Sequence, residues 1–195
     1  MHLKSDDARW GSMAKFFHWA VVILLLVQAT IGLVMVQLPK RPSVIPWFNF
    51  HKSLGLTILL LALLRLLWRA FDRHPLPPLA MPRWQVLGAR AGHVLLYGLL
   101  FAVPISGWLF DSASSLRPLF WWDLVKMPNL TGGPNADLKP IAQVAHLWLF
   151  LALAAVAAGH AAAALAHHFV QRDDVLRRML PGRRSLSTPN QESSP

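Results

Sequence analysis

Four long apolar segments constrain the fold of this chain more than any other feature of its sequence. They lie at about residues 16–36, 51–69, 91–110 and 141–168. A helix needs about 20 mostly apolar residues to cross the hydrocarbon core of a bilayer, and each segment is close to or above that length. Of the 195 residues, 54% are hydrophobic and only 14% are charged, which is too apolar for an ordinary soluble domain.

The sequence therefore predicts an all-α fold, an integral membrane four-helix bundle. We expect one domain, which is a transmembrane four-helix domain over residues 1–182. The last residues, 183–195, are rich in Ser, Pro, Asn and Gln, and we expect them to form a disordered tail. The longest connection, 111–140, contains Trp121 and Trp122, which we expect on a short helix at the membrane interface.

The positive charges predict the orientation of the bundle. Four spans place both ends of the chain on one side of the membrane, and 13 of the 19 Lys and Arg residues flank the spans on that side. Because positive residues concentrate in cytoplasmic loops, we expect both termini in the cytoplasm. The net charge of +10 does not indicate nucleic acid, since the basic residues flank apolar segments and no RNA- or DNA-binding motif is present. We expect membrane lipid as the surrounding partner.

The absence of cysteine limits the metal chemistry that is open to this chain. Disulfides, iron–sulfur clusters, thiolate zinc sites and covalently attached c-type haem all require cysteine. A bound metal or haem must therefore be held by histidine, methionine or carboxylate.

Histidines inside the apolar segments are the candidate functional residues, because an ionisable side chain in a membrane is costly without a partner. His146 and His160 are fourteen residues apart on the fourth segment, so they return to within ~40° of one helix face and lie roughly 21 Å apart along the axis. This spacing indicates two sites at two depths. With the predicted orientation, His51 lies at the outer depth of His146, and His18 at the inner depth of His160. Each pair joins two helices, as ligation of a b-type haem by two histidines requires.

Other histidines leave alternatives open. His167 also returns to the face of His160, within ~20°, and could replace it as a ligand. His93 could be a ligand, a contact to a haem propionate or a quinone, or a packed polar residue. Any single histidine near a helix end could instead be an interfacial hydrogen-bonding group. Arg65 lies near the end of the second segment, where its flexible stem can reach the headgroups.

Small residues one turn from the predicted ligands favour a flat macrocycle, although they also suit plain helix packing. They are Gly55, Ala142, Ala157 and Ala164.

Several motifs around these histidines carry a resemblance to a known family. They are Phe17-His18-Trp19, His51-Lys-Ser-Leu-Gly55, Gly92-His93-Val-Leu-Leu-Tyr97, Ala145-His146, Gly159-His160 with His167-His168, and the stretch from Asp174 to Pro181. Over about residues 10–182 the chain resembles the bacterial cytochrome b561 family, the four-helix dihaem proteins of the bacterial inner membrane. It is more distantly similar to the cytochrome b subunits of membrane hydrogenases and formate dehydrogenases.

The resemblance implies two haem b cofactors and iron ligands at four positions. His51 and His146 would bind the outer haem, and His18 and His160 the inner one; the resemblance, more than depth, prefers His160 to His167. It also implies electron exchange with ubiquinone as substrate, and for some members oxidation of superoxide at the periplasmic face. The activity expected from it is that of an oxidoreductase of the superoxide:ubiquinone type, or of an electron carrier.

The expected function is therefore transmembrane electron transfer between a quinone and a second redox partner, either superoxide or an unidentified redox protein. An alternative is a membrane-anchor subunit that passes electrons between a partner dehydrogenase or hydrogenase and quinone. A histidine-lined transporter of divalent metals is disfavoured, because the apolar segments contain no carboxylate.

Overall fold

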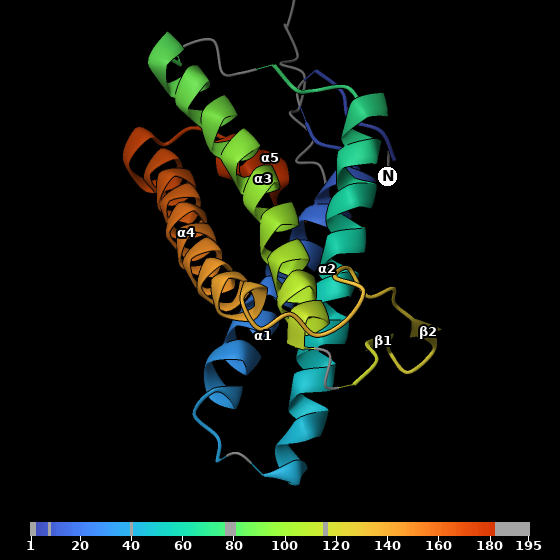
Figure 1. Ribbon diagram of the computed structural model, residues 1–195. Helices are drawn as coiled ribbons and strands as arrows, with labels where there is room; N and C mark the ends of the chain where they lie inside the picture. Colours follow the sequence, from blue (N-terminus) through green and yellow to red (C-terminus); the bar gives the residue numbers. More distant parts are fainter. Residues whose placement is uncertain (1–2, 8, 40, 77–80, 115–116, 182–195) are drawn as a thin grey trace, which may run out of the picture.

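The computed structural model describes all residues except 1–2, 8, 40, 77–80, 115–116 and 182–195. Four long helices form a bundle (Figure 1). They are α1 (Ser12–Met35), α2 (Ile45–Phe71), α3 (Arg83–Ser114) and α4 (Leu138–Ala166). Each is part of a segment long and apolar enough to cross a membrane, so the predicted four-helix membrane bundle is confirmed. The predicted disordered tail, 183–195, lies outside the described residues.

The helices extend beyond the apolar segments that predict them. Helix α2 begins six residues before His51, after a short 3-10 helix η1 (Pro42–Val44). Pro46 is tolerated in the first turn of α2, because the backbone N–H groups there have no partner within the helix. Helix α3 likewise continues through Asp111 to Ser114. Apolar length measures only the hydrocarbon part of a span, whereas the hydrogen-bonded helix continues into polar residues.

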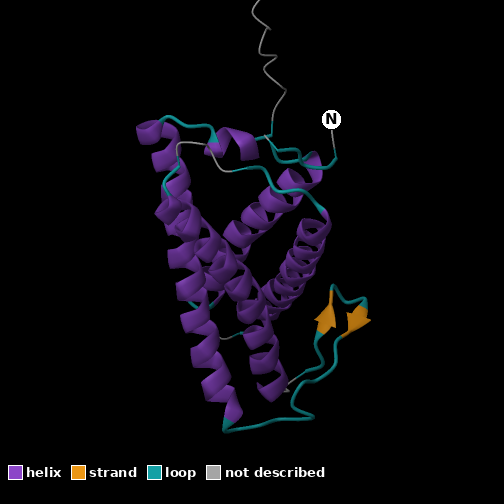
Figure 2. Cartoon of the chain, turned by 90° about the horizontal axis from the view of Figure 1, so that it is seen from above, coloured by secondary structure: helices purple, strands orange, loops and turns teal. Residues whose placement is uncertain are grey.

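The two ends of the bundle differ. The N-terminal segment, the connection from α2 to α3 and the short helix α5 (Val175–Met179) lie at one end, called here the inner end (Figure 1). The connection from α1 to α2 and a small hairpin outside the bundle lie toward the other, the outer end (Figures 1 and 2). Helix α3 packs most extensively on α4, and α1 on α2.

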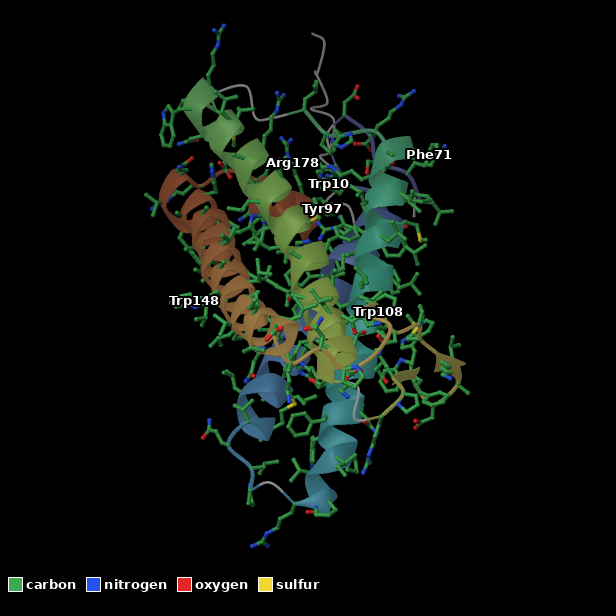
Figure 3. The ribbon with its side chains drawn as sticks, viewed as in Figure 1. Trp10, Phe71, Tyr97, Trp108, Trp148 and Arg178 are labelled. Atoms are coloured by element: carbon green, nitrogen blue, oxygen red, sulfur yellow. The ribbon has the colours of Figure 1, made fainter. Side chains whose placement is uncertain are left out.

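The core is a cluster of buried apolar residues contributed by all four long helices. It contains Val21, Leu54, Ile58, Ala62, Leu99, Leu100 and Leu153. Large apolar side chains also cover the outside of the bundle: Leu26, Val94 and Trp148 are 66%, 74% and 63% exposed. Figure 3 shows Trp148 on α4, away from the other helices. Such a continuous apolar exterior is suited to lipid and would be a liability in water.

Hydrogen bonds hold the N-terminal segment and α5 to the inner end of the bundle. The backbone N–H and hydroxyl of Ser5 donate to the buried carboxylate of Asp72, at 2.8 and 2.6 Å. The N–H of Gly11, just before α1, donates to the Ser5 hydroxyl at 2.9 Å. The indole of Trp19 donates to the carbonyl oxygen of Met179 in α5 at 2.9 Å. These contacts connect the inner ends of α1 and α2 and the last described helix.

The predicted short helix at Trp121 and Trp122 is wrong. The structure instead has a hairpin of β1 (Phe120–Trp121) and β2 (Val125–Lys126), paired antiparallel. Trp122 and Asp123 have φ values of 52° and 57°, which turn the chain back on itself. Both indoles donate to the hydroxyl of Thr57 on α2, at 3.0 and 2.9 Å. The tryptophans therefore dock the hairpin on the bundle.

Candidate functional site: two layers of histidines

A spacing of fourteen residues recurs on all four long helices. It separates His18 from Gly32 on α1, His51 from Arg65 on α2, His93 from Gly107 on α3, and His146 from His160 on α4. Fourteen residues span about 21 Å of helix and return to nearly the same face. Because successive helices run in opposite directions (Figure 1), one residue of each pair lies at the outer depth and the other at the inner depth.

These eight residues form two layers. The outer layer consists of Gly32, His51, Gly107 and His146, and the inner layer consists of His18, Arg65, His93 and His160.

A layer of apolar side chains lies midway between the outer and inner layers. On each long helix, one apolar residue lies seven positions from both layer residues. These residues are Leu25, Ile58, Leu100 and Leu153. Ile58, Leu100 and Leu153 belong to the buried core, and Leu25 packs against it. Seven residues correspond to about 10 Å of helix, so packed apolar side chains separate two polar layers inside one bundle.

In the outer layer, the imidazoles of His51 and His146 face each other across the bundle. Their ring centres are 6.4 Å apart, and the ring planes are nearly perpendicular at 88°. A Cβ atom at Gly32 would lie 3.0 Å from Cε1 of His51, and one at Gly107 would lie 3.0 Å from Cε1 of His146. A side chain at either position would therefore require the neighbouring imidazole to move by a few tenths of an ångström, and glycine on α1 and α3 avoids this.

The orientation of the His146 ring is fixed by two oxygen atoms of α3. Its Nδ1 lies 3.0 Å from the carbonyl oxygen of Val103 and 3.0 Å from the hydroxyl of Ser106. The Ser106 hydroxyl itself donates to the Val103 carbonyl at 2.7 Å. Since a carbonyl oxygen only accepts, Nδ1 carries the proton and the lone pair of Nε2 is available for a metal ion. Metal-binding histidines are commonly held in this way.

The partner ring, His51, contacts Gln28 of α1. The Gln28 amide donates to the His51 carbonyl at 2.9 Å and lies 3.3 Å from the ring Nε2. Coordination of a metal by Nε2 would replace the second contact and keep the first.

In the inner layer, the imidazoles of His18 and His160 have the same separation. Their ring centres are 6.4 Å apart, with the planes at 70°. His93 lies beside them, with its ring centre 5.2 Å from that of His160. The guanidinium carbon of Arg65 lies 5.4 Å from the ring centre of Tyr97, one turn after His93 on α3. The inner layer thus contains three imidazoles and one permanent cation.

His167, the alternative to His160, is directed elsewhere. After α4 the chain forms a π-helical turn, η2 (His167–Gln171), and Nδ1 of His167 pairs with the carboxylate of Asp173 at 2.5 Å. The N–H of Asp173 donates to the carbonyl of His167 at 3.1 Å, which closes the turn. The ring of His168 packs against Phe169, with ring centres 4.8 Å apart. The structure therefore groups His160, and not His167, with His18.

The separation within each pair fits a metal between two imidazoles. A bond of about 2.0 Å from each nitrogen to the metal, and about 1.1 Å from that nitrogen to its ring centre, would place the two centres roughly 6.2 Å apart. Both pairs are at 6.4 Å. His93 and His160, at 5.2 Å, are too close for the same arrangement.

Prediction from the sequence missed part of these layers. Gly32, Gly107 and Ser106 were not among the candidates, although the fourteen-residue spacing, applied to α1 and α3, points to both glycines. A Cβ atom at Gly55, which was expected beside a macrocycle, would lie 3.2 Å from the Gln28 amide nitrogen. Arg65, which was expected to reach the headgroups, lies over Tyr97 in the inner layer.

Comparison with known proteins gives one family. The sequence model of the family described as prokaryotic cytochrome b561 matches residues 9–182. Cytochrome b561 homolog 2 of Escherichia coli K12 is 34% identical over 186 residues, which cover 92% of this chain and 95% of the relative. A probable superoxide oxidase, CybB, of Yersinia pestis is 34% identical over 94% of this chain and 99% of its own length. Cytochrome b561 homolog 1 of E. coli K12 is 30% identical over 90% of this chain and 99% of that protein.

Proposed function

Because the chain belongs to the prokaryotic cytochrome b561 family, and is thus a multi-pass b-type cytochrome of the bacterial inner membrane, we propose that each histidine pair binds one haem. His51 and His146 hold the outer haem, and His18 and His160 hold the inner one. The observation that carries this proposal is the 6.4 Å separation of the ring centres in both pairs, which would leave room for one iron between two imidazoles.

The positive charges support an orientation with the inner end in the cytoplasm. Thirteen of the 19 Lys and Arg residues flank the spans at that end. The N-terminal segment and α5 lie at that same end of the bundle (Figure 1).

Bound haem supplies a one-electron change at iron, and the chain determines how that change is used. With His51 and His146 on one haem and His18 and His160 on the other, each iron would be held by two histidines, which would favour electron transfer over binding of oxygen. The hydrogen bonds from Nδ1 of His146 to Val103 and Ser106 hold one ligand in the correct tautomer. The apolar layer around Ile58, Leu100 and Leu153 keeps water out from between the two levels.

We further propose that electrons pass from superoxide at the outer face to ubiquinone. Two superoxide anions each lose one electron and become dioxygen, while one quinone takes up two electrons and two protons and becomes the quinol. The name of the Yersinia relative supports this donor. A hollow of about 560 Å³ near the outer end of α3 is lined by Arg117, Lys126 and the carboxylate Asp111, which is paired with Lys52; the net positive charge of these side chains would attract a small anion.

Proteoliposomes that contain the purified protein and ubiquinone test this function. Superoxide generated outside the vesicles should reduce the haem bands and then yield one quinol for every two superoxide anions consumed. Superoxide that leaves the haem oxidised would contradict the proposed donor. Copurification of a large soluble dehydrogenase or hydrogenase subunit, with no quinone reduction by the isolated chain, would instead favour the membrane-anchor function.

The glycine beside His146 gives a further prediction. Replacing Gly107 with valine should lower the occupancy of the outer haem by about half or more, because its Cβ would lie 3.0 Å from Cε1 and 3.2 Å from Nδ1 of His146. Haem per chain, measured by the pyridine haemochrome method, reports the loss. Gly98→Val is the matched control: it lies on the same helix, and its Cβ would meet nothing within 4 Å. Equal haem content in the two variants would contradict the role given to Gly107.

A further inference from the structure

Arg65 lies at the depth of the inner histidine pair. It stands fourteen residues after His51 on α2 and six residues before the end of that helix. His18 lies six residues after the start of α1, and His160 lies six residues before the end of α4. Each of these three residues is therefore about 9 Å inside the inner end of its helix. Arg65 continues the buried stripe of Ile58 and Ala62, so its side chain starts from the inward face of α2.

The guanidinium group of Arg65 contacts an aromatic ring, and it pairs with no carboxylate among the described residues. It lies over Tyr97, which Figure 3 labels on α3 toward the inner end, and it is within electrostatic range of His18, His93 and His160. Among the described residues Lys52 pairs with Asp111 and Arg178 with Asp174, and Nδ1 of His167 contacts the carboxylate of Asp173. None of them includes Arg65. A charge at this depth requires an anion nearby, because desolvation is costly.

The two layers differ at the helices that supply no haem ligand. In the outer layer these helices are α1 and α3, and they carry Gly32 and Gly107. In the inner layer they are α2 and α3, and they carry Arg65 and His93. Asp111, the carboxylate on the membrane helices that the structure describes, lies toward the outer end and is paired with Lys52. On the described membrane helices no carboxylate lies at the inner depth, so an anionic group bound there would complement the charge of Arg65.

We propose that Arg65 binds a propionate carboxylate of the inner haem and so stabilises the reduced form of that haem. This inference rests on the proposed haem sites. The propionates are the only anionic side groups of haem b, and the planar guanidinium can bind a carboxylate through two parallel hydrogen bonds. A positive charge beside the macrocycle favours ferrous over ferric iron, because reduction removes one positive charge from the centre.

Redox titration of the full-length protein in lipid nanodiscs tests the effect on the inner haem. We expect Arg65→Met to lower the midpoint potential of the inner haem, with ferrous iron destabilised about tenfold relative to ferric iron, which is about 59 mV for one electron. The outer haem should keep its potential. The same substitution in a His146→Ala background, which should contain only the inner haem, assigns the shift. Arg69→Met is the matched control, since Arg69 lies one turn nearer the inner end, over Trp10 at 6.0 Å.

Resonance Raman spectroscopy supplies a readout of the contact itself. The propionate bending mode of the inner haem should shift in Arg65→Met and also in Arg65→Lys, because an ammonium group cannot make the two-pronged contact. Arg65→Lys should nevertheless keep most of the potential, since it keeps the charge. Loss of the inner haem alone in Arg65→Met, with retention in Arg65→Lys, also supports the proposal.

Three outcomes overturn the inference. One is an inner potential and a propionate mode that are unchanged in Arg65→Met, as they would be if Arg65 bound a lipid phosphate. Another is an equal shift of both haems, which would indicate a general effect on the bundle. If Arg65→Met does not accumulate in the membrane, an unchanged propionate mode in Arg65→Lys decides against the contact. A wild-type protein without haem would instead refute the proposed function, and the two failures are thereby distinguished.

Discussion

Replacing His146 with alanine should remove the outer haem and leave the inner one in place. The substitution deletes one of the two proposed iron ligands, since the rings of His51 and His146 face each other with their centres 6.4 Å apart. The inner pair lies about 21 Å away along the helices, beyond a layer of packed apolar side chains, so it should keep its cofactor. Haem per chain should therefore fall by about half, and the remaining haem should titrate as a single one-electron component.

Gln143→Ala is the control for His146→Ala, because Gln143 is exposed on the same helix and should keep both haems. Loss of both haems from His146→Ala, with the helical content of the bundle intact, would mean that the two sites are not independent. Full retention of haem would mean that His146 is not a ligand.

A second large loss of haem is expected from a substitution in the inner layer, where His160 and His167 are the two candidates for one iron ligand. His160→Ala should remove the inner haem, because its ring faces His18 at 6.4 Å. His167→Ala should keep both haems, because the His167 imidazole is paired with Asp173 in the turn after α4. The paired substitutions change the same chemical group seven residues apart, so each controls for the other.

Haem content and the reduced-minus-oxidised spectrum of the two variants decide between these histidines. An inner haem that survives in His160→Ala and is lost in His167→Ala would reverse the assignment. Loss of the inner haem in both variants would show that the turn η2 is required to form the site.

Much of the fold follows from apolar length and charge alone. Four segments of sufficient length predict four helices, because each such helix satisfies its own backbone hydrogen bonds in lipid. The fourteen-residue spacing of His146 and His160 also predicts two depths, and the structure places His51 and His18 at those depths. Their role as iron ligands remains a prediction that the substitutions above test.

The supporting residues could not be predicted in the same way. Gly32 and Gly107 matter because α1 and α3 pass close to imidazoles on other helices. A Cβ atom added at either glycine would lie 3.0 Å from an imidazole carbon. That contact depends on how the helices cross, and the sequence periodicity of a single helix does not determine the crossing. Ser106 is a further case, because its hydroxyl becomes useful only where α4 places His146 beside the Val103 carbonyl.

Local backbone geometry explains two other differences between the structure and what the sequence predicts. The π-helical turn at His167 redirects that side chain, whereas a regular helix would keep it on the face of His160. The hairpin at Trp121 depends on two residues with positive φ and on the Thr57 hydroxyl of another element. Aromatic content alone indicates an interface and does not determine whether the segment is helical or extended.

The count of haems per chain in the purified wild-type protein is the most direct test of the two-layer arrangement. Haem can be quantified as the pyridine haemochrome against protein determined by amino-acid analysis, with the reduced-minus-oxidised spectrum recorded on the same sample. The paired geometry of His51 with His146 and of His18 with His160 predicts two b-type haems per chain. A ratio of one, or the absence of a b-type spectrum, would contradict it.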